Sequence, residues 1–349
     1  MTTLLDRGTG TADLATSAPL APTARTAPRG GGGVRRVLRA LVRGFAVAVP
    51  VLFITSFITF LLGVFADQQP AELLLGESAT REDVARLNAE MGLDQPVIVQ
   101  YITWVGNALR GDLGTSYFTG IPVTDSIIQR LPVSLSIAIF AFLIALVIGS
   151  LAGTLAAVRQ GGIFDRAVTI VSATIATLPP FVLAIALIVI FGVLWPILPT
   201  GGYVDPAFSV SLWFTSLILP AVALSLDAAA DVARQLRTGL VGTLGENYII
   251  GARLRGLSGR RILFVHALRN GAGPAVATLG LQVPRLIGGA VIAEAIFSLP
   301  GLGQLARDGA MRGDVPVVIG TLVVTVGIVL ISSLLVNLVL AALRPEVRR

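Results

Sequence analysis

Long apolar runs separated by polar segments dominate the chain. Six of these runs reach the ~20 helical residues needed to cross the hydrocarbon core of a membrane. The pattern therefore predicts an all-α polytopic membrane protein with six transmembrane helices. A proline pair, Pro179 and Pro180, is predicted to kink the third of them, because proline removes backbone donors. The predicted spans are residues 44–66, 132–158, 167–194, 211–233, 275–297 and 315–343.

The distribution of arginine predicts the orientation of these spans. Nineteen of the 26 basic residues lie at the two ends of the chain or in the loops of the same side, and six lie in the opposite loops. The positive-inside rule then places both termini in the cytoplasm. Residues 67–130 carry nine acids against four arginines, which places them outside.

The polar segments divide the chain into regions. Residues 1–33 are rich in Thr, Ala, Pro and Gly and are predicted to be a disordered cytoplasmic tail. The first span with its basic flank occupies 34–66, and it is too long for a cleaved signal-peptide core. Residues 67–131 form a small extracytoplasmic lid region with short helices. The transmembrane domain then covers 132–343, and 344–349 form a cytoplasmic tail.

Composition excludes several classes of function. The chain is 54% hydrophobic and 13% charged, with a mean hydropathy of +0.84, whereas soluble domains carry roughly a quarter charged residues. It contains no cysteine and no lysine, which excludes thiol chemistry, a P-loop lysine and a Schiff base. A single histidine leaves almost no means of holding catalytic zinc. We therefore expect no catalytic residue, cofactor or metal site, and we attribute the high pI to membrane topology rather than to nucleic-acid binding.

The polar segment between the fourth and fifth spans, residues 244–270, is the most informative part of the sequence. Five arginines lie in it, with Arg237 just upstream, and its pattern predicts two short amphipathic helices. Gly256 permits a sharp turn between them, and Ser258 is placed to cap the second. The segment suits either docking on a cytoplasmic partner or binding to anionic lipid. The expected faces are Tyr248, Ala252 and Arg255 on the first helix, and Ile262, Val265, His266 and Arg269 on the second.

Four ionisable residues lie in or near the predicted spans and are candidates for the translocation path: Asp227, Asp231, Arg285 and Glu294. Charged groups at this depth are costly and are often functional. Asp227 and Arg285 fall at similar depths, so we predict that they pair beside the path. The alternatives are a static ion pair between helices, or a pair of Asp231 with Arg234. Glu294 suits a structural hydrogen-bonding role as well as a gate.

Several motifs in order resemble the ABC importer permeases of the dipeptide/oligopeptide/nickel family, in their DppB/OppB-type inner-membrane subunit. Two positions depart from the general EAA loop of such permeases: Leu268-Arg269 replaces a Leu-Pro, and Ile250-Gly251 stand where Glu-Ala would begin. The matching segments are 92–116, 130–132, Ala252-x-x-x-Gly256 with Leu257-Ser258, 266–270, Glu294, 299–303, Asp314-x-Pro316 and Arg344-Pro345.

The resemblance implies a permease subunit without enzymatic activity of its own, in a bacterial inner membrane. Its EAA loop would dock on cytoplasmic ABC ATPase subunits, which bind ATP and Mg²⁺. A second homologous permease would complete the path, and an extracytoplasmic solute-binding protein would deliver peptides. The implied coupling residues are Glu246, Tyr248, Gly251, Ala252, Arg255, Gly256, Leu257, Arg261 and His266.

Other readings remain at this point. Relatives of this family also carry nickel chelates or glutathione-like substrates. An ion-coupled secondary transporter would use acids near the membrane centre, but it needs internal repeats that the sequence does not display. A membrane-embedded enzyme needs a nucleophile with its base or a metal pair, whereas His266 lies in a predicted loop and Asp227 and Asp231 share one helix.

Overall fold

The computed structural model describes residues 32–65, 70–76 and 80–343. Nearly all of this part of the chain is helical, and the one β-contact within it is an isolated bridge between Thr115 and Pro122. The predicted all-α class is therefore confirmed. The expected tail 344–349 lies outside the described residues, as does nearly all of 1–33.

Five helices are long and apolar enough to cross a membrane, and a sixth span results if the bent pair α6 and α7 counts as one. These are α1, α5, α8, α12 and α14, and they correspond to the first, second, fourth, fifth and sixth predicted spans. The complete order is α1 (Gly32–Val64), α2 (Pro70–Leu75), α3 (Arg81–Glu90), α4 (Val97–Ala108), α5 (Val123–Val158), α6 (Ile163–Thr177), α7 (Pro180–Ile188), η1 (Val189–Leu194), α8 (Val210–Leu244), α9 (Asn247–Leu254), α10 (Gly259–Arg261), η2 (Ile262–Ala267), α11 (Leu268–Gly271), α12 (Gly273–Ile296), α13 (Leu302–Arg312) and α14 (Val315–Leu343).

The third predicted span is broken rather than kinked. The axis turns by 108° between α6 and the continuous stretch of α7 and η1. Leu178 is extended, with a ψ of 135°, because the residue before a proline is driven out of the helical region. Pro179 and Pro180 have no N–H to donate to α6, and Pro180 begins α7 at the position where this loss costs nothing.

Several helices extend beyond the predicted membrane boundaries. α5 begins at Val123 and contains Pro132, which we had expected to open the span. α6 begins at Ile163, so the preceding loop is shorter than predicted, and α8 continues to Leu244. The apolar run therefore marks the lipid-facing part of each helix, whereas capping and turn residues determine where the helix ends.

Small residues allow the central helices α5 and α8 to approach closely. A β-carbon at Gly149 would lie 2.9 Å from the carbonyl oxygen of Ala229, and one at Gly153 would lie 2.7 Å from that of Ala233. Such contacts favour association where lipid removes the hydrophobic drive between helices. α12 packs against both helices and brings Leu286 into a core of buried alanines.

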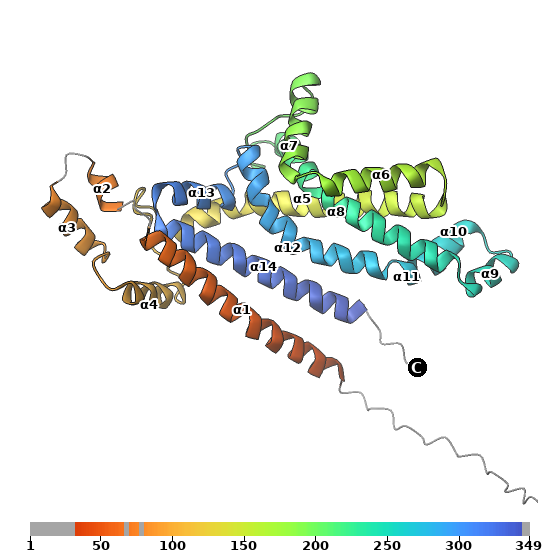
Figure 1. Cartoon of the computed structure of the whole chain (residues 1–349), viewed down its shortest axis with the longest axis horizontal. Coiled ribbons are helices and arrows are strands. Elements are labelled where there is room, and N and C mark those ends of the chain that lie inside the picture. The colour runs from red at the N-terminus through yellow and green to blue at the C-terminus, as the bar shows by residue number, and fades with distance from the viewer. Residues whose placement is uncertain (1–31, 66–69, 77–79, 344–349) are drawn as a thin grey trace, which may run out of the picture.

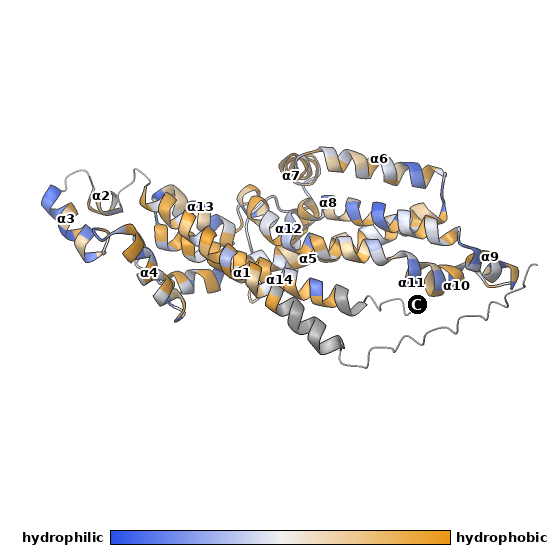
Figure 2. Ribbon diagram, turned by 60° about the horizontal axis from the view of Figure 1, so that its bottom comes forward, coloured by the Kyte–Doolittle hydropathy of each residue, from blue (hydrophilic) through white to orange (hydrophobic). Residues whose placement is uncertain are grey.

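The polar parts of the chain lie at opposite ends of an elongated bundle. Helices α2, α3 and α4 are at one end and α9 and α10 at the other (Figure 1). The beginning of α1 and the end of α14 point towards the α9 end. Figure 2 shows hydrophilic residues on α3 and near α9–α11, with mostly hydrophobic helices between them.

Candidate functional site

Residues 245–272 fold back on themselves between α8 and α12, and we call them the elbow. α9 leads outwards, Gly256 reverses the chain, and α10, η2 and α11 lead back to α12. Gly256 has a φ of +78°, and a β-carbon added to it would meet no atom within 4 Å. Glycine is thus needed for its left-handed backbone and not for lack of space. The Ser258 hydroxyl accepts a hydrogen bond from the N–H of Arg261 and caps α10, as expected.

The interior of the elbow is a small apolar cluster. Ile249, Ala252 and Ile262 are buried in it, with Leu244 and Leu257 packed against them. Of the face predicted for the first helix, only Ala252 is buried. Tyr248 is exposed, and its hydroxyl accepts a hydrogen bond of 2.9 Å from the amide of Asn270. Arg255 is exposed as well, because α9 ends before it.

The predicted face of the second helix is wrong because part of that helix is a π-helix. η2 covers Ile262–Ala267, and a π-helix places residues five apart, not four, above one another. Ile262 and Ala267 are buried, whereas Val265 and Arg269 are exposed and His266 is half-buried. A pattern search at the α-helical period of 3.6 residues does not detect this arrangement.

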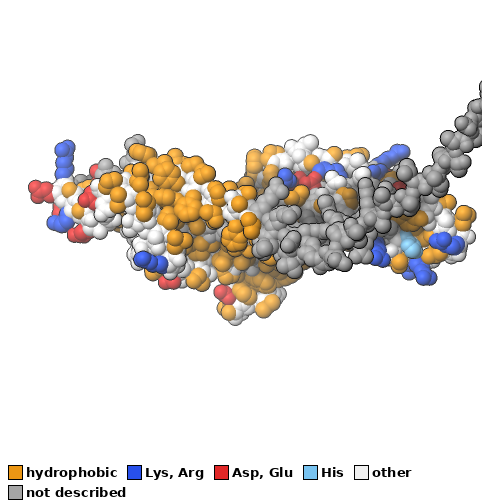
Figure 3. Space-filling model, turned by 90° about the horizontal axis from the view of Figure 1, so that it is seen from below, with side chains coloured by type: hydrophobic (Ala, Val, Ile, Leu, Met, Phe, Trp, Pro, Cys, Tyr) orange, Lys and Arg blue, Asp and Glu red, His pale blue; other side chains and the backbone are white. Residues whose placement is uncertain are grey.

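The outer surface of the elbow combines exposed apolar side chains with arginines. Leu254 is 85% exposed and Phe264 is 65% exposed. Figure 3 shows basic side chains, the histidine and hydrophobic side chains together at this end of the molecule. Other members of the surface are Glu246, Ile250, Arg253, Arg255, Arg260, Arg261 and Val265, which are exposed, and Gly251, which is half-buried.

A contact between glycine backbones attaches the elbow to α8. A β-carbon on Gly239 of α8 would lie 2.1 Å from the carbonyl oxygen of Gly271 in α11. Leu236, Leu240 and Ala267 form a buried cluster beside it. Sequence reasoning missed this junction, since neither glycine belongs to a recognisable motif.

A second attachment joins α6 to the same end of α8. Asp165 accepts hydrogen bonds from two nitrogens of the Arg237 guanidinium, and its Oδ2 also accepts from the N–H of Gly161 at 2.8 Å. The Asp165 side chain is 5% exposed. Sequence analysis had counted Arg237 only as a positive charge near the elbow. No local pattern connects the two residues, because they lie 72 positions apart in the sequence.

Both carboxylate oxygens of Asp231 accept hydrogen bonds from other side chains of the protein. It accepts a hydrogen bond from the guanidinium of Arg234 and another of 2.7 Å from the amide of Gln282. Arg234 also donates to the carbonyl oxygen of Ser172, at 3.0 Å, and so joins α8 to α6. The alternative role for Asp231, a pair with Arg234, therefore matches the structure.

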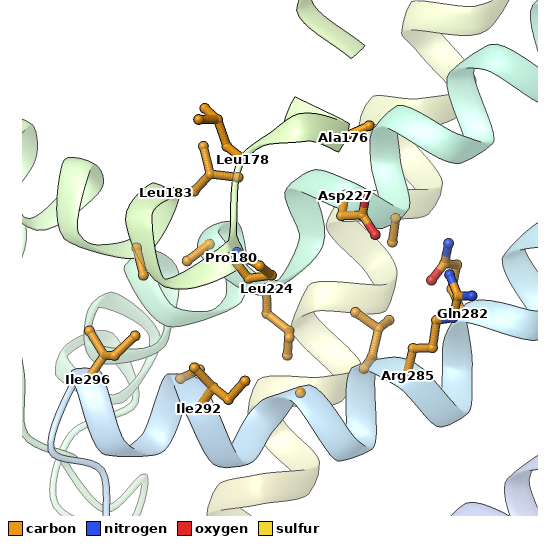
Figure 4. A pocket seen from close by; sticks show the side chains of 16 residues that line it. Ala176, Leu178, Pro180, Leu183, Leu224, Asp227, Gln282, Arg285, Ile292 and Ile296 are labelled. Atoms are coloured by element: carbon orange, nitrogen blue, oxygen red, sulfur yellow. The ribbon is translucent and has the colours of Figure 1, made fainter. Parts of the chain in front are cut away.

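Asp227 and Arg285 line one cavity but do not form the ion pair that we predicted. The cavity has a volume of about 300 Å³ and lies between the α6–α7 break, α8 and α12. No nitrogen of Arg285 is within 4.0 Å of a carboxylate oxygen of Asp227. Both side chains extend into the same part of the cavity (Figure 4). Similar depth therefore predicted proximity correctly and direct pairing incorrectly.

Glu294 has a structural position away from this cavity. It is fully buried and accepts hydrogen bonds from the Ser134 hydroxyl at 2.6 Å and from the N–H groups of Gly303 and Gln304. The Ser134 hydroxyl in turn accepts from the N–H of Leu302. The carboxylate thus caps the first turn of α13 and ties that helix to α5 and α12.

Within the described residues, no three His, Cys, Asp or Glu side chains come together as a metal site. The two candidate features of the described residues are the elbow surface and the cavity. One suits the binding of a protein partner, and the other suits a small polar ligand with apolar side chains.

Comparisons with known proteins match nearly the whole chain. Residues 149–349 match the family described as the binding-protein-dependent transport system inner membrane component, and residues 37–138 match its N-terminal family. A probable peptide ABC transporter permease of Sinorhizobium fredii is 36% identical over 312 residues, covering 89% of this chain and 98% of that protein.

Two further relatives have similar coverage. A putative peptide transport system permease of Brucella abortus is 36% identical over 308 residues, covering 88% of this chain and 98% of the relative. The dipeptide transport system permease of Escherichia coli is 32% identical over 336 residues, covering 89% and 99%.

A solved structure supports the fold. The MetNI methionine ABC transporter in an inward-facing conformation superposes with a TM-score of 0.51 at 20% identity, over 63% of this chain and 96% of that one. The family resemblance expected from the motifs is confirmed. The chain is therefore a multi-pass inner-membrane protein that belongs to the family of binding-protein-dependent transport system inner membrane components.

Proposed function

We propose that this chain is the permease subunit of an ATP-driven, binding-protein-dependent importer whose substrates are peptides. The observation that carries the proposal is the nearly full-length match to peptide permeases from three genera. The chain supplies the path through the membrane and a docking surface for the ATPase subunits. ATP and Mg²⁺ are bound and ATP is hydrolysed by separate cytoplasmic subunits.

The orientation proposed from the arginine census has both termini and the elbow in the cytoplasm. The elbow and the helices α2–α4 occupy opposite ends of the bundle (Figure 1). The acidic segment 67–130 then faces outwards, where a solute-binding protein would deliver its ligand. Membrane lipid covers the exposed apolar sides of helices such as α1, whose Phe45 and Leu62 are both exposed.

The elbow is proposed to be the docking surface for an ATPase subunit. Leu254 and Phe264 stand out from it as apolar anchors, and arginines surround them. Exposed apolar patches with a polar rim are typical of protein interfaces. A groove with an apolar floor and an acidic rim on the ATPase subunit would complement this surface. Anionic lipid remains the competing partner.

Movement of the docked ATPase would reach the bundle through two attachments. The Gly239–Gly271 contact allows little relative sliding of α8 and α11, because the backbones already touch. The Asp165–Arg237 pair joins the same end of α8 to α6. A second, homologous permease subunit would complete the path, as expected for this family. A partner that binds one conformation better shifts the equilibrium towards it.

The test uses the importer reconstituted with its ATPase subunits, second permease and binding protein. Leu254→Asp should abolish co-purification of the ATPase and lower peptide uptake to background, because it places a charge in the proposed apolar contact. Leu109→Asp is the matched control, since Leu109 is 80% exposed and follows directly on α4, a helix at the opposite end of the molecule from α9 (Figure 1). It should leave ATPase co-purification unchanged.

Two results would contradict the docking proposal. One is a Leu254→Asp importer that retains its ATPase and transports normally. The other is a variant that retains the ATPase but loses binding to anionic vesicles, which would assign the elbow to lipid. Uptake of nickel chelates or glutathione in place of peptides would correct the substrate class and leave the importer mechanism intact.

A further inference from the structure

The cavity between the α6–α7 break, α8 and α12 contains two opposite charges that the protein leaves without partners. Asp227 comes from α8 and Arg285 from α12, and both line the space of about 300 Å³. Neither side chain has a hydrogen-bond or ion-pair partner within the described residues. Asp227 is half-buried, and Arg285 is exposed. Charges at membrane depth are costly unless they are satisfied, so two unpaired charges that face one cavity indicate a ligand that pairs with them.

The neighbouring polar groups are already occupied, which isolates this pair. Asp231 accepts hydrogen bonds from Arg234 and from Gln282, so its charge is balanced by Arg234 and not by Arg285. The gap between the two charged groups exceeds salt-bridge distance. Both groups line the same cavity of about 300 Å³, which is the space available to a small molecule.

The rest of the cavity wall is apolar. Leu183, Leu224 and Ile292 line it, and Pro180 contributes its ring at the bend (Figure 4). The volume is at the lower end of the range for small-molecule sites, which begins at about 300 Å³. A ligand that fits has charged ends and small apolar side chains.

We propose that this cavity is a subsite for small zwitterions with a free amino and a free carboxyl group, such as dipeptides. The inference rests on the proposed importer function and specifies what its path accepts. The ammonium group pairs with Asp227, and the carboxylate accepts two parallel hydrogen bonds from Arg285. A blocked peptide or a neutral sugar leaves at least one of the two charges unpaired, which costs binding free energy.

The experiment measures equilibrium binding of radiolabelled dialanine to the complete importer in nanodiscs, with no binding protein present. N-acetyl-dialanine and dialanine amide are the two blocked ligands. We expect wild type to prefer dialanine over each of them by about tenfold, the factor for one lost charge-assisted hydrogen bond.

Two variants separate the two ends of the ligand. Asp227→Asn should remove the preference over N-acetyl-dialanine and keep the preference over the amide. Arg285→Gln should do the reverse. Asp308→Asn and Arg312→Gln are the matched controls. They remove one negative and one positive charge from α13 and should keep both preferences.

Three results would overturn the subsite: equal binding of all three ligands to wild type, equal losses for all three in both variants, or no dialanine binding by an importer whose ATP hydrolysis still responds to binding protein. In each case the importer function itself stands. A preparation whose hydrolysis responds to no binding protein would overturn both proposals, and this readout comes from the same sample.

Discussion

The backbones of Gly239 and Gly271 touch where the elbow returns to the bundle. The carbonyl oxygen of Gly271 occupies the space that a side chain on Gly239 would need, and Gly239 blocks Gly271 in the same way. The hydroxyl of Thr243 donates to the carbonyl of Gly239 at 2.8 Å on the same side of α8. α8 and α11 therefore meet without intervening side chains, and displacement of one displaces the other.

Gly239→Ala is expected to weaken both folding and coupling. The added methyl group forces the two helices apart, and overpacking of this kind costs about 1–3 kcal/mol of unfolding free energy. The melting temperature should fall, and ATP hydrolysis should become less dependent on binding protein. Gly242→Ala, three residues on in α8, has nothing within 4 Å and should be neutral or stabilising. Equal effects of the two substitutions would contradict the role of the contact.

The Asp165–Arg237 pair should contribute far more than an exposed ion pair does. Asp165→Asn removes the charge opposite Arg237 and should lower the melting temperature, because it leaves the guanidinium without its carboxylate partner. The Asp165 side chain is 5% exposed and that of Arg237 is 30% exposed. A double-mutant cycle with Arg237→Gln, read by thermal unfolding, isolates the coupling energy between the two residues.

The exposed Asp83–Arg86 pair on α3 is the control for this cycle. Its side chains are 37% and 69% exposed, and water and salt screen such a pair, so its coupling energy should be close to zero. Coupling energies of similar size in the two cycles would show that the bidentate contact contributes no more to the stability of the α6–α8 junction than an exposed pair does.

Glu294→Gln should loosen the first turn of α13. The carboxylate accepts N–H groups from Gly303 and Gln304, and a negative charge at a helix N-terminus is favourable. An amide keeps one acceptor oxygen but loses the charge. We expect amide hydrogen exchange in the first turn of α13 to become about tenfold faster, as for the loss of ~1.4 kcal/mol of local stability.

Ser134→Ala should act in the same direction through Leu302, whose N–H it leaves without a partner. Gln304→Ala is the control, because the main-chain N–H of that residue binds Glu294 and the side chain is not needed. Unchanged exchange at the start of α13 in both test variants would assign Glu294 to another role.

The ionisation of Tyr117 is expected to make the folded protein less stable at alkaline pH. Burial, together with the nearby carboxylate of Asp314, raises the pKa of Tyr117 to about 12 from its ordinary 10.0. As pH rises from 10 towards 12, the unfolded chain releases this proton first, so stability falls over that interval. Below pH 10 the phenol is protonated in both states, and its contribution is constant.

Thermal unfolding between pH 9 and 12 tests this expectation. Tyr117→Phe should flatten the alkaline decline, whereas Tyr248→Phe, at an exposed tyrosine of the elbow, should not. An alkaline decline of the same steepness in Tyr117→Phe and wild type would exclude this tyrosine as its source.

The periodicity of the sequence predicts the helices well and their contacts poorly. The six apolar runs and the turn at Gly256 follow from local properties, namely hydrophobic length and backbone freedom. Local sequence contains no signal for the π-helix η2, and therefore the buried face of the elbow differs from the prediction. The same holds for the pair of Asp165 with Arg237, which lie 72 residues apart.

The cavity shows the same division between local and tertiary information. Charged residues inside apolar runs identified Asp227 and Arg285 as unusual, and the helical rise placed them at similar depth. The distance between these two side chains depends on how α8 and α12 pack. The hydrogen bond that Asp231 of α8 accepts from Gln282 of α12 depends on the same packing. Only tertiary packing determines these contacts.

The double proline between α6 and α7 also limits how the permease can move. Two successive pyrrolidine rings, at Pro179 and Pro180, withhold two backbone donors and disfavour a straight helix through this point in every step of a transport cycle. The corner between α6 and α7 is therefore expected to persist when the path opens and closes. Displacement of α8 or α12, the two helices that carry Asp227 and Arg285, would change the width of the space beside the corner without straightening it.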